Sequence, residues 1–241
     1  PDLPALNGFY MSYRAWVRAK VHSIKSREQE VPDSDKQESR LRAKKLYSRS
    51  LEYALTGLSP LVAVIMGSVG TGKTTVAKSL SDELGWPVAR SDCVRKKLAG
   101  FPLRERPGRG EKERLYNADM TRKTYETLCK KAVTEAEKGN SMLLDATYGC
   151  RSLRDSLRKT LQQRGIAYCF IELCADKDTV MKRVRKRELS PERISDAGVQ
   201  TAEKLMERYE APDSLEDACH IRVDSSSSLP HCFCCSAFGP G

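Results

Sequence analysis

The chain has 241 residues, of which 39% are hydrophobic and 31% charged, so it can bury one sizeable core with some appended helices. Its 42 Lys and Arg against 32 Asp and Glu give a formal net charge of +10, which favours anionic ligands but does not separate a small phosphorylated ligand from nucleic acid. No apolar stretch reaches the roughly 18 residues that a membrane span needs, and the first residues lack the pattern of a secretory signal, so we expect a soluble, cytoplasmic protein.

Two helices are predicted ahead of the main domain. Over residues 9–30, aromatic and aliphatic side chains recur at spacings of three and four, which is typical of an amphipathic helix. A polar break at residues 31–35 precedes a charged helix over residues 39–55 that ends near Gly57. We therefore assign residues 1–57 to an N-terminal helical segment. The chain begins with Pro1 and not with methionine, and we expect it to be a fragment or a processed form of a longer product.

The main domain is predicted to alternate strands and helices. It begins at Leu61 with a continuous apolar run, typical of a strand buried on both faces of a parallel sheet. Further strands are predicted at residues 88–90, 141–145, 167–173 and 221–223, and helices at residues 73–84, 111–137, 151–163, 176–187 and 198–209. This alternation predicts an α/β fold, a parallel sheet of about five strands sandwiched by helices, within a domain over residues 58–224.

The last segment, residues 225–241, is rich in serine and cysteine, and we expect it to be flexible. His231, Cys232, Cys234 and Cys235 are crowded together, and no second Cys or His pair follows at zinc-finger spacing, so we do not expect a zinc site. The cysteines before this segment are scattered among predicted helices and strands, which indicates reduced thiols.

A phosphate-binding motif of the form GxxxxGK(S/T) follows the first strand and opens a helix. In this context the backbone N–H groups of a glycine-rich loop and the helix N-terminus bind phosphate oxygens. The sequence therefore predicts a P-loop NTPase fold that binds ATP and Mg²⁺. In this loop Lys73 is expected to neutralise the β- and γ-phosphates, and the Thr74 hydroxyl to ligate Mg²⁺. The predicted nucleotide-binding residues are Gly67, Ser68, Val69, Gly70, Thr71, Gly72, Lys73, Thr74 and Thr75.

Two acidic residues follow predicted strands. Asp145 ends an apolar strand, as expected of a carboxylate that holds Mg²⁺ directly or through water; the alternative is an ordinary turn or helix-cap aspartate. Asp92 follows the strand at residues 88–90 and could orient an acceptor hydroxyl and take its proton. The alternative is that Asp92 only caps a helix beginning at Cys93.

Arg183 and Arg187 lie on one face of a predicted helix that ends in a basic run. Arginines that close over the phosphates could stabilise charge in the transition state. The alternative is a solvated basic helix end that interacts with its own dipole.

These motifs together resemble the AAA_33 or zeta-toxin-like P-loop kinases, which are related to gluconate kinases and polynucleotide kinase. The resemblance covers about residues 60–224. It rests on residues 67–75, 91–100 and 144–147, and on Arg187 followed by residues 195–197.

The resemblance implies that Asp92 is the acceptor-side base, that Arg95 contacts the substrate, and that Arg183 and Arg187 are nucleotide-side arginines of a mobile lid. Relatives differ in which acid contacts magnesium, so the match of Asp145 is less specific. Residues 8–25 are similar to the final helix of an aminoglycoside phosphotransferase-like domain, which implies that such a domain precedes this one in the full-length protein.

Three functions fit this pattern. The favoured one is an ATP-dependent kinase acting on a hydroxyl of a small molecule, with Lys73, Asp92 and Arg187 as catalytic residues. The second is a polynucleotide 5′-hydroxyl kinase, which fits the positive charge but lacks a readable nucleic-acid-binding module. The third is a regulatory ATP-binding or ATPase module that phosphorylates no acceptor.

Overall fold

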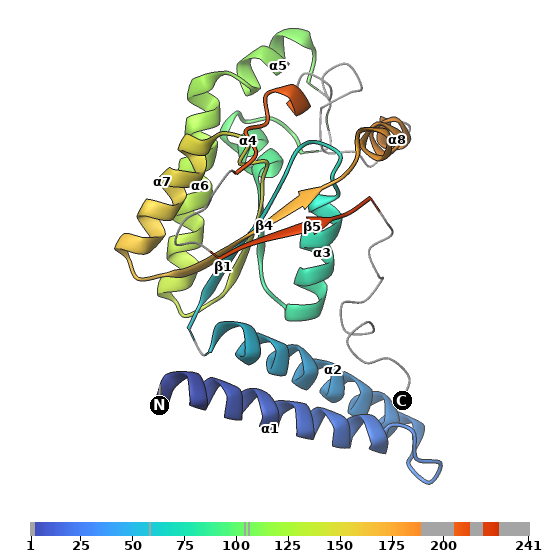
Figure 1. The fold of residues 1–241 in the computed structure, drawn as a ribbon. Coiled ribbons are helices and arrows are strands. Elements are labelled where there is room, and N and C mark those ends of the chain that lie inside the picture. The colour runs from blue at the N-terminus through green and yellow to red at the C-terminus, as the bar shows by residue number, and fades with distance from the viewer. Residues whose placement is uncertain are drawn as a thin grey trace. The chain divides into compact units, whose positions relative to one another are not determined.

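The structure, a computed structural model, describes residues 3–57, 59–103, 105, 107–188, 205–212 and 219–226. The chain divides into two compact units. One comprises residues 1–60 and 80–85, and the other comprises residues 61–79 and 86–241. The first unit contains a helical hairpin and the second contains the β-sheet (Figure 1).

The hairpin consists of α1 (Leu3–Lys25) and α2 (Asp33–Thr56). Both helices begin six residues before their predicted starts, and α1 ends five residues before its predicted end. Gly57 ends α2 in the left-handed conformation, with φ 57°, and its N–H donates to the carbonyl of Tyr53. This is a glycine helix C-cap, and it agrees with the end predicted from the sequence.

Small residues form the contact between α1 and α2. Ala19 is fully buried, and a Cβ atom at Gly8 would lie only 2.7 Å from the Cα of Gly57. Ser12 and Ser50 each donate a hydroxyl to the other's carbonyl, at 2.8 and 2.9 Å. The large apolar residues that predicted an amphipathic α1 lie mostly elsewhere on this helix and are exposed; they include Phe9, Tyr10, Tyr13, Val17, Val21 and Ile24.

The second unit contains one sheet of five strands, all parallel, in the order β2-β3-β1-β4-β5. The strands are β1 (Leu61–Met66), β2 (Val88–Arg90), β3 (Met142–Asp145), β4 (Ala167–Cys174) and β5 (Cys219–Asp224). The predicted α/β fold with about five parallel strands is thus confirmed.

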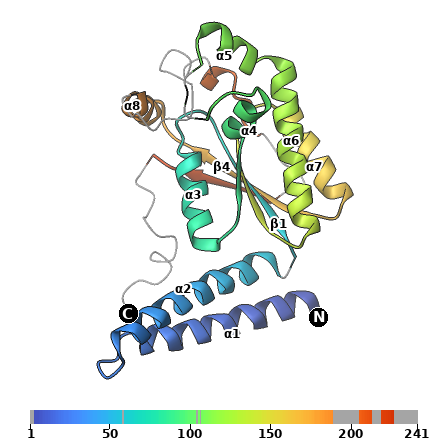
Figure 2. The same ribbon diagram turned by 180° about the vertical axis from the view of Figure 1, so that it is seen from behind.

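Helices cover both faces of this sheet (Figures 1 and 2): α6 and α7 lie on one side, and α3 and α8 on the other. All β1 residues from Val62 to Met66 are buried as a result, which explains the continuous apolar run of this strand. The helices of this part of the chain are α3 (Lys73–Leu84), α4 (Ser91–Leu98), α5 (Arg109–Leu115), α6 (Ala118–Glu137), α7 (Arg151–Gln163) and α8 (Lys177–Glu188).

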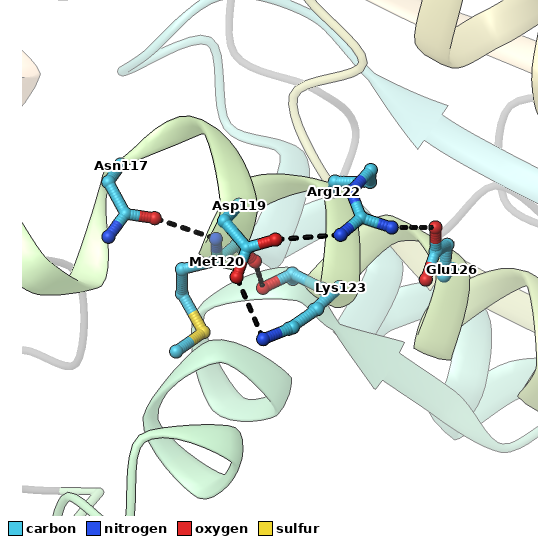
Figure 3. Close-up of polar contacts among 7 residues, drawn as sticks. Asn117, Asp119, Met120, Arg122, Lys123 and Glu126 are labelled. Carbon is cyan, nitrogen blue, oxygen red and sulfur yellow. Dashed lines mark hydrogen bonds and ion pairs between the residues drawn. The ribbon is translucent and has the colours of Figure 1, made fainter.

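The prediction of one long helix over residues 111–137 is wrong, because the structure has two helices there, α5 and α6. The break falls at Tyr116 and Asn117, and the side chain of Asn117 accepts a hydrogen bond of 2.7 Å from the N–H of Met120 (Figure 3). An asparagine in this position starts a new helix, because it binds an N–H group that has no partner within the helix.

Charged side chains follow this cap along the surface of α6. Asp119 in the first turn accepts hydrogen bonds of 2.7 Å from both Arg122 and Lys123, and Arg122 also donates to Glu126 at 3.1 Å (Figure 3). The hydrogen bonds from Lys123 and Arg122 lower the pKa of Asp119. A negative charge at the N-terminus and neighbouring ion pairs favour the start of α6 at this point.

The helix predicted over residues 198–209 falls largely outside the described residues, as do residues 227–241 of the predicted tail. Ser225 and Ser226, the first residues of that tail, are described, and Ser225 is fully buried.

Candidate active site

The phosphate-binding loop, residues 67–74, connects β1 to α3. Gly67 and Gly70 have φ angles of 137° and 76°, which side-chain-bearing residues rarely adopt. A Cβ atom at Gly67 would lie 2.3 Å from the carbonyl oxygen of Leu173, and one at Gly70 would lie 2.8 Å from Cγ1 of Val180. The end of β4 and helix α8 therefore approach the loop so closely that no side chain fits at either position.

Two side chains of this loop bind one of its own carbonyl groups. Nζ of Lys73 donates to the oxygen of Ser68 at 2.6 Å, and Oγ1 of Thr71 donates to the same oxygen at 2.9 Å. Lys73 is also the first residue of α3, so the lysine charge and the positive end of the helix dipole lie at the same place. This combination is suited to a phosphate group.

Asp145 links the loop to the neighbouring strands. Its Oδ2 accepts a hydrogen bond of 2.8 Å from the hydroxyl of Thr74, and it pairs at 3.3 Å with Nε of Arg90. The sheet register brings these groups together, because Asp145 lies opposite Ile65 of β1 and opposite Arg90 of β2. Only 6% of the Asp145 side chain is exposed, so the carboxylate is held in a largely dry position.

The pair formed by Thr74 and Asp145 fits a magnesium ion. A hydroxyl and a carboxylate offer the oxygen ligands that Mg²⁺ prefers, and the ion keeps several waters in such sites. Thr74 lies at the start of α3 and is exposed, so solvent water reaches the residue.

Arg90 belongs to this site, although the sequence analysis did not select it. It is the last residue of β2, directly before Ser91 and Asp92. Its contact with Asp145 depends on the pairing register of β2 with β3, which no local sequence motif indicates. A basic residue at the carboxyl end of a core strand is the one sequence signal that points to it.

Asp92 lies in the first turn of α4, which starts at Ser91 and not at Cys93. The residue before the helix, Arg90, makes no side-chain cap. Asp92 therefore stands inside the helix and is not its N-cap residue, and its negative charge is favourable beside the positive end of the helix dipole. Because Arg90 lies opposite Asp145 in the sheet, Asp92 follows the strand next to the one that ends in the predicted magnesium ligand.

Tyr125 of α6 lies close enough to Asp92 and Arg95 for their charges to act on its phenol. Burial raises the pKa of Tyr125 to about 12, and the charges of Arg95 and Asp92 act on it in opposite directions. The phenol is therefore neutral, and its oxygen accepts a hydrogen bond of 3.2 Å from the N–H of Tyr148, in the segment that follows Asp145.

Arg95 is held by protein groups. Its Nη1 donates to the carbonyl of Leu115 at 2.9 Å and to Oγ1 of Thr121 at 3.1 Å, and its guanidinium lies 4.8 Å from the centre of the Tyr116 ring. Only 6% of the residue is exposed. These contacts connect α4 to the junction between α5 and α6, so the geometry favours a structural task for Arg95 over contact with a substrate.

Arg183 reaches the phosphate-binding loop from α8. Its Nη1 lies 3.9 Å from the position that a Cβ atom of Gly72 would occupy, and donates to Oγ of Ser225 at 3.1 Å. Its Nη2 donates to the carbonyl of Ser225. The hydroxyl of Ser225 in turn donates to the carbonyl of Thr71 at 2.7 Å. Ser225 was not among the predicted site residues, because a run of serines after the last strand is typical of a loop.

Arg187 lies one helical turn beyond Arg183, in the last turn of α8. Residues 189–204, which include the predicted lid and its motif at residues 195–197, lie outside the described part of the chain, so the role of Arg187 stays a prediction. Within the described residues no three or more His, Cys, Asp or Glu side chains are grouped as a metal site, and the cluster at residues 231–235 is not among them.

The parallel sheet of order β2-β3-β1-β4-β5, with the GxxxxGKT loop between its central strand and α3, defines the P-loop NTPase fold. The chain matches the AAA_33 family, described as an AAA domain, over residues 62–212, and it belongs to this family. The family predicted from the sequence is thus confirmed. The upstream aminoglycoside phosphotransferase-like domain stays a prediction.

Known proteins similar to this chain include kinases. An uncharacterized protein of Mycobacterium tuberculosis is 28% identical over 184 residues, which are 76% of this chain and 35% of that protein. The gluconokinase of Gluconobacter oxydans is 29% identical over 138 residues, which are 55% of this chain and 68% of the enzyme. The chain thus spans about a third of the length of the mycobacterial relative.

A solved structure shares the fold. Kti12 of Chaetomium thermophilum in complex with ADP-AlF₃ superimposes with a TM-score of 0.52 at 16% identity, over 69% of this chain and 89% of that one. Among the helices that the structure describes, none is both long and apolar enough to cross a membrane.

Proposed function

We propose that this chain is a kinase that transfers the γ-phosphoryl group of ATP to a hydroxyl group of a small molecule. One observation carries the proposal: the loop lysine, the Thr74–Asp145 pair and Asp92 all follow neighbouring strands at the carboxyl edge of one sheet. Ligands of open α/β sheets bind at this edge. A phosphate site and a separate carboxylate next to it are the two halves that phosphoryl transfer to a hydroxyl requires.

The two halves have different tasks. Lys73 and the N–H groups of the loop bind the phosphates, while the carboxylate of Asp92 accepts a hydrogen bond from the acceptor hydroxyl and orients it. The hydroxyl oxygen forms a bond to the γ-phosphorus as the bond from that phosphorus to the β–γ bridging oxygen breaks. The hydroxyl proton passes to Asp92, and ADP leaves with the bridging oxygen.

Magnesium would be held by Thr74 and Asp145, and when bound it supplies positive charge to the phosphate oxygens. Arg90 pairs with Asp145 at 3.3 Å, so it is suited to keep this carboxylate oriented. Arg183 contacts the loop from α8, and we assign it to the nucleotide. We assign Arg187 to the charge that develops on the transferred group.

The placement of basic residues supports a small acceptor over a polynucleotide. Arg95, Lys96 and Arg154 are buried and donate to backbone carbonyls, and the exposed Arg122 and Lys123 pair with Asp119. These five basic residues are thus engaged within the protein, whereas a polymer site needs several cations directed at successive phosphates. The similarity to a gluconokinase points in the same direction.

A phosphorylation screen tests the proposal. The protein is incubated with Mg²⁺, ATP and a pool of cellular metabolites, and mass spectrometry searches for a product that is one phosphoryl group heavier. We expect such a product with the parent protein and none with Lys73→Ala. A 5′-hydroxyl oligonucleotide is offered in parallel at low and high salt. Phosphorylation of the oligonucleotide alone would replace the proposal with a polynucleotide kinase.

A further inference from the structure

The geometry points to Ser225 as a positioning residue that sets the orientation of the phosphate-binding loop. Ser225 follows β5 directly and is fully buried. Its N–H donates to the carbonyl of Cys174 at 2.8 Å, which fixes its backbone to the end of β4. This inference rests on the proposed function in one respect, namely that residues 67–74 bind the phosphates of ATP.

The direction of the Ser225 hydroxyl is determined by its neighbours. A hydroxyl has one hydrogen to donate and lone pairs to accept. Nη1 of Arg183 donates to Oγ of Ser225 at 3.1 Å, so the serine hydrogen must serve another group. The carbonyl oxygen of Thr71 lies closest, at 2.7 Å, and that of Cys174 lies at 3.0 Å. Ser225 therefore acts as a donor to the loop and as an acceptor for Arg183 at the same time.

The bond to Thr71 determines where the next N–H group points. Thr71 and Gly72 share a peptide bond, and the carbonyl and N–H of a planar trans peptide point in opposite directions. Because the Thr71 carbonyl is directed at Ser225, the N–H of Gly72 is directed away from Ser225. Gly72 has a φ of 94°, a conformation open to glycine, so without the anchor this peptide plane could rotate more readily. Ser225 thus keeps the Gly72 N–H aligned for a phosphate oxygen.

Ser225 has a second effect, because it also binds the guanidinium of Arg183. Both terminal nitrogens of Arg183 bind Ser225, one through the hydroxyl and one through the carbonyl. The guanidinium is thereby fixed beside Gly72, where its charge reaches the same phosphates as the loop. Loss of the hydroxyl would loosen the peptide plane and remove one of the two bonds that orient the arginine.

The test compares two ligands that share phosphates and differ in the base. Affinities for Mg-ATP and for inorganic tripolyphosphate with Mg²⁺ are measured by calorimetry on the parent protein and on Ser225→Ala. We expect Ser225→Ala to weaken both ligands by the same factor, about tenfold, because a buried carbonyl loses its hydrogen-bond donor and the loop loses its alignment. Loss of ATP affinity with unchanged tripolyphosphate affinity would instead assign Ser225 to the base and overturn the inference.

Ser226→Ala is the matched control. The Ser226 hydroxyl lies in the same loop but accepts from the N–H of Asp176 at 3.0 Å, and we expect both affinities to stay at parent values. Equal losses in the two alanine variants would mean a general disturbance and would contradict the inference. If Ser225→Ala does not fold, Ser225→Cys, which keeps the size with a weaker donor, replaces it in the same comparison.

Failure of this inference is separable from failure of the proposed function, because the test measures binding without transfer. A parent protein that binds both ligands but phosphorylates nothing would reject the kinase while leaving the comparison of serine variants intact. A parent that transfers phosphate, with Ser225→Ala indistinguishable from it, would reject only the task of Ser225.

Discussion

Asp145 has two partners, a neutral hydroxyl and a cationic guanidinium. It accepts a hydrogen bond from the Thr74 hydroxyl and forms an ion pair with Arg90, and its carboxylate is nearly buried. A cation and a hydrogen-bond donor on one oxygen hold such a buried carboxylate in a fixed orientation. At the scale of single residues, this arrangement keeps an oxygen ligand ready beside the loop for a divalent ion.

Thr74→Val tests the magnesium ligand. Valine has nearly the same shape as threonine but no hydroxyl, so the variant should need about tenfold more Mg²⁺ for half-maximal ATP turnover, through loss of one ligand in the first or second coordination shell. A magnesium titration of turnover measures this. Thr127→Val is the control, since it makes the same change in α6, where the Thr127 hydroxyl donates only to the carbonyl of Lys123 among the contacts described. An equal shift in both variants would remove Thr74 from the metal site.

Asp92→Asn tests the acceptor side. Asparagine keeps the size of the side chain but not its negative charge, so transfer should fall by about 10²- to 10⁴-fold, the usual contribution of a general base, while ATP affinity stays near the parent value. Calorimetry and a transfer assay measure the two effects separately. Asp119→Asn, which removes a charge on the exposed surface of α6, should change neither. Weaker ATP binding in Asp92→Asn would move Asp92 to the magnesium site.

At the scale of elements, the loop is confined by the ends of β4 and α8. The carbonyl of Leu173 lies against Gly67, and Val180 lies against Gly70, so these glycines of the motif serve packing as well as phosphate binding. Backbone groups cannot yield as a flexible side chain can, which makes Gly67 the least replaceable of the loop glycines.

Gly67→Ala should therefore destabilise the protein much more than the replacement of a glycine that also has a positive φ but lies in open surroundings. Gly139 has a φ of 81° and nothing within 4 Å of its Cβ position, so Gly139→Ala should cost about 1 kcal/mol of unfolding free energy. Gly67→Ala should cost about 3 kcal/mol or more, because strand β4 or the loop must shift. Urea unfolding measures both; similar losses would contradict the close packing of loop against strand.

Elements with strong local signals could be predicted from the sequence. Helix α7 was predicted with its observed bounds, and buried strands were predicted from their apolar runs. The break between α5 and α6 was missed because helix-forming residues flank Asn117 on both sides, and the preference of asparagine for a helix start was outweighed by them.

The candidate site shows the same division between local and distant signals. The phosphate-binding loop is one contiguous motif, so its position between β1 and α3 could be predicted. Arg90 depends on the register of β2 with β3, and Ser225 depends on a bond to Thr71 across 154 positions of the sequence. Neither relation leaves a pattern in one sequence, because tertiary contacts of this kind are set by the whole sheet.

At the scale of the whole molecule, the residues assigned to nucleotide, metal and acceptor all belong to the unit that carries the sheet. The helical hairpin contributes none of them. The chain spans only 35% of the mycobacterial relative, so the activity proposed here is that of the region that matches the AAA_33 family, residues 62–212.

The fate of the γ-phosphoryl group tests this claim most directly. ATP labelled with ¹⁸O in the γ-phosphate is supplied with Mg²⁺ and the acceptor pool, and ADP, inorganic phosphate and phosphoesters are counted by mass spectrometry. If the protein is a kinase, we expect one labelled phosphoester for each ADP formed, and we expect Lys73→Ala to form neither product. Labelled inorganic phosphate equal to the ADP, formed at a rate that the acceptor pool does not change, would contradict the account and identify an ATPase module instead.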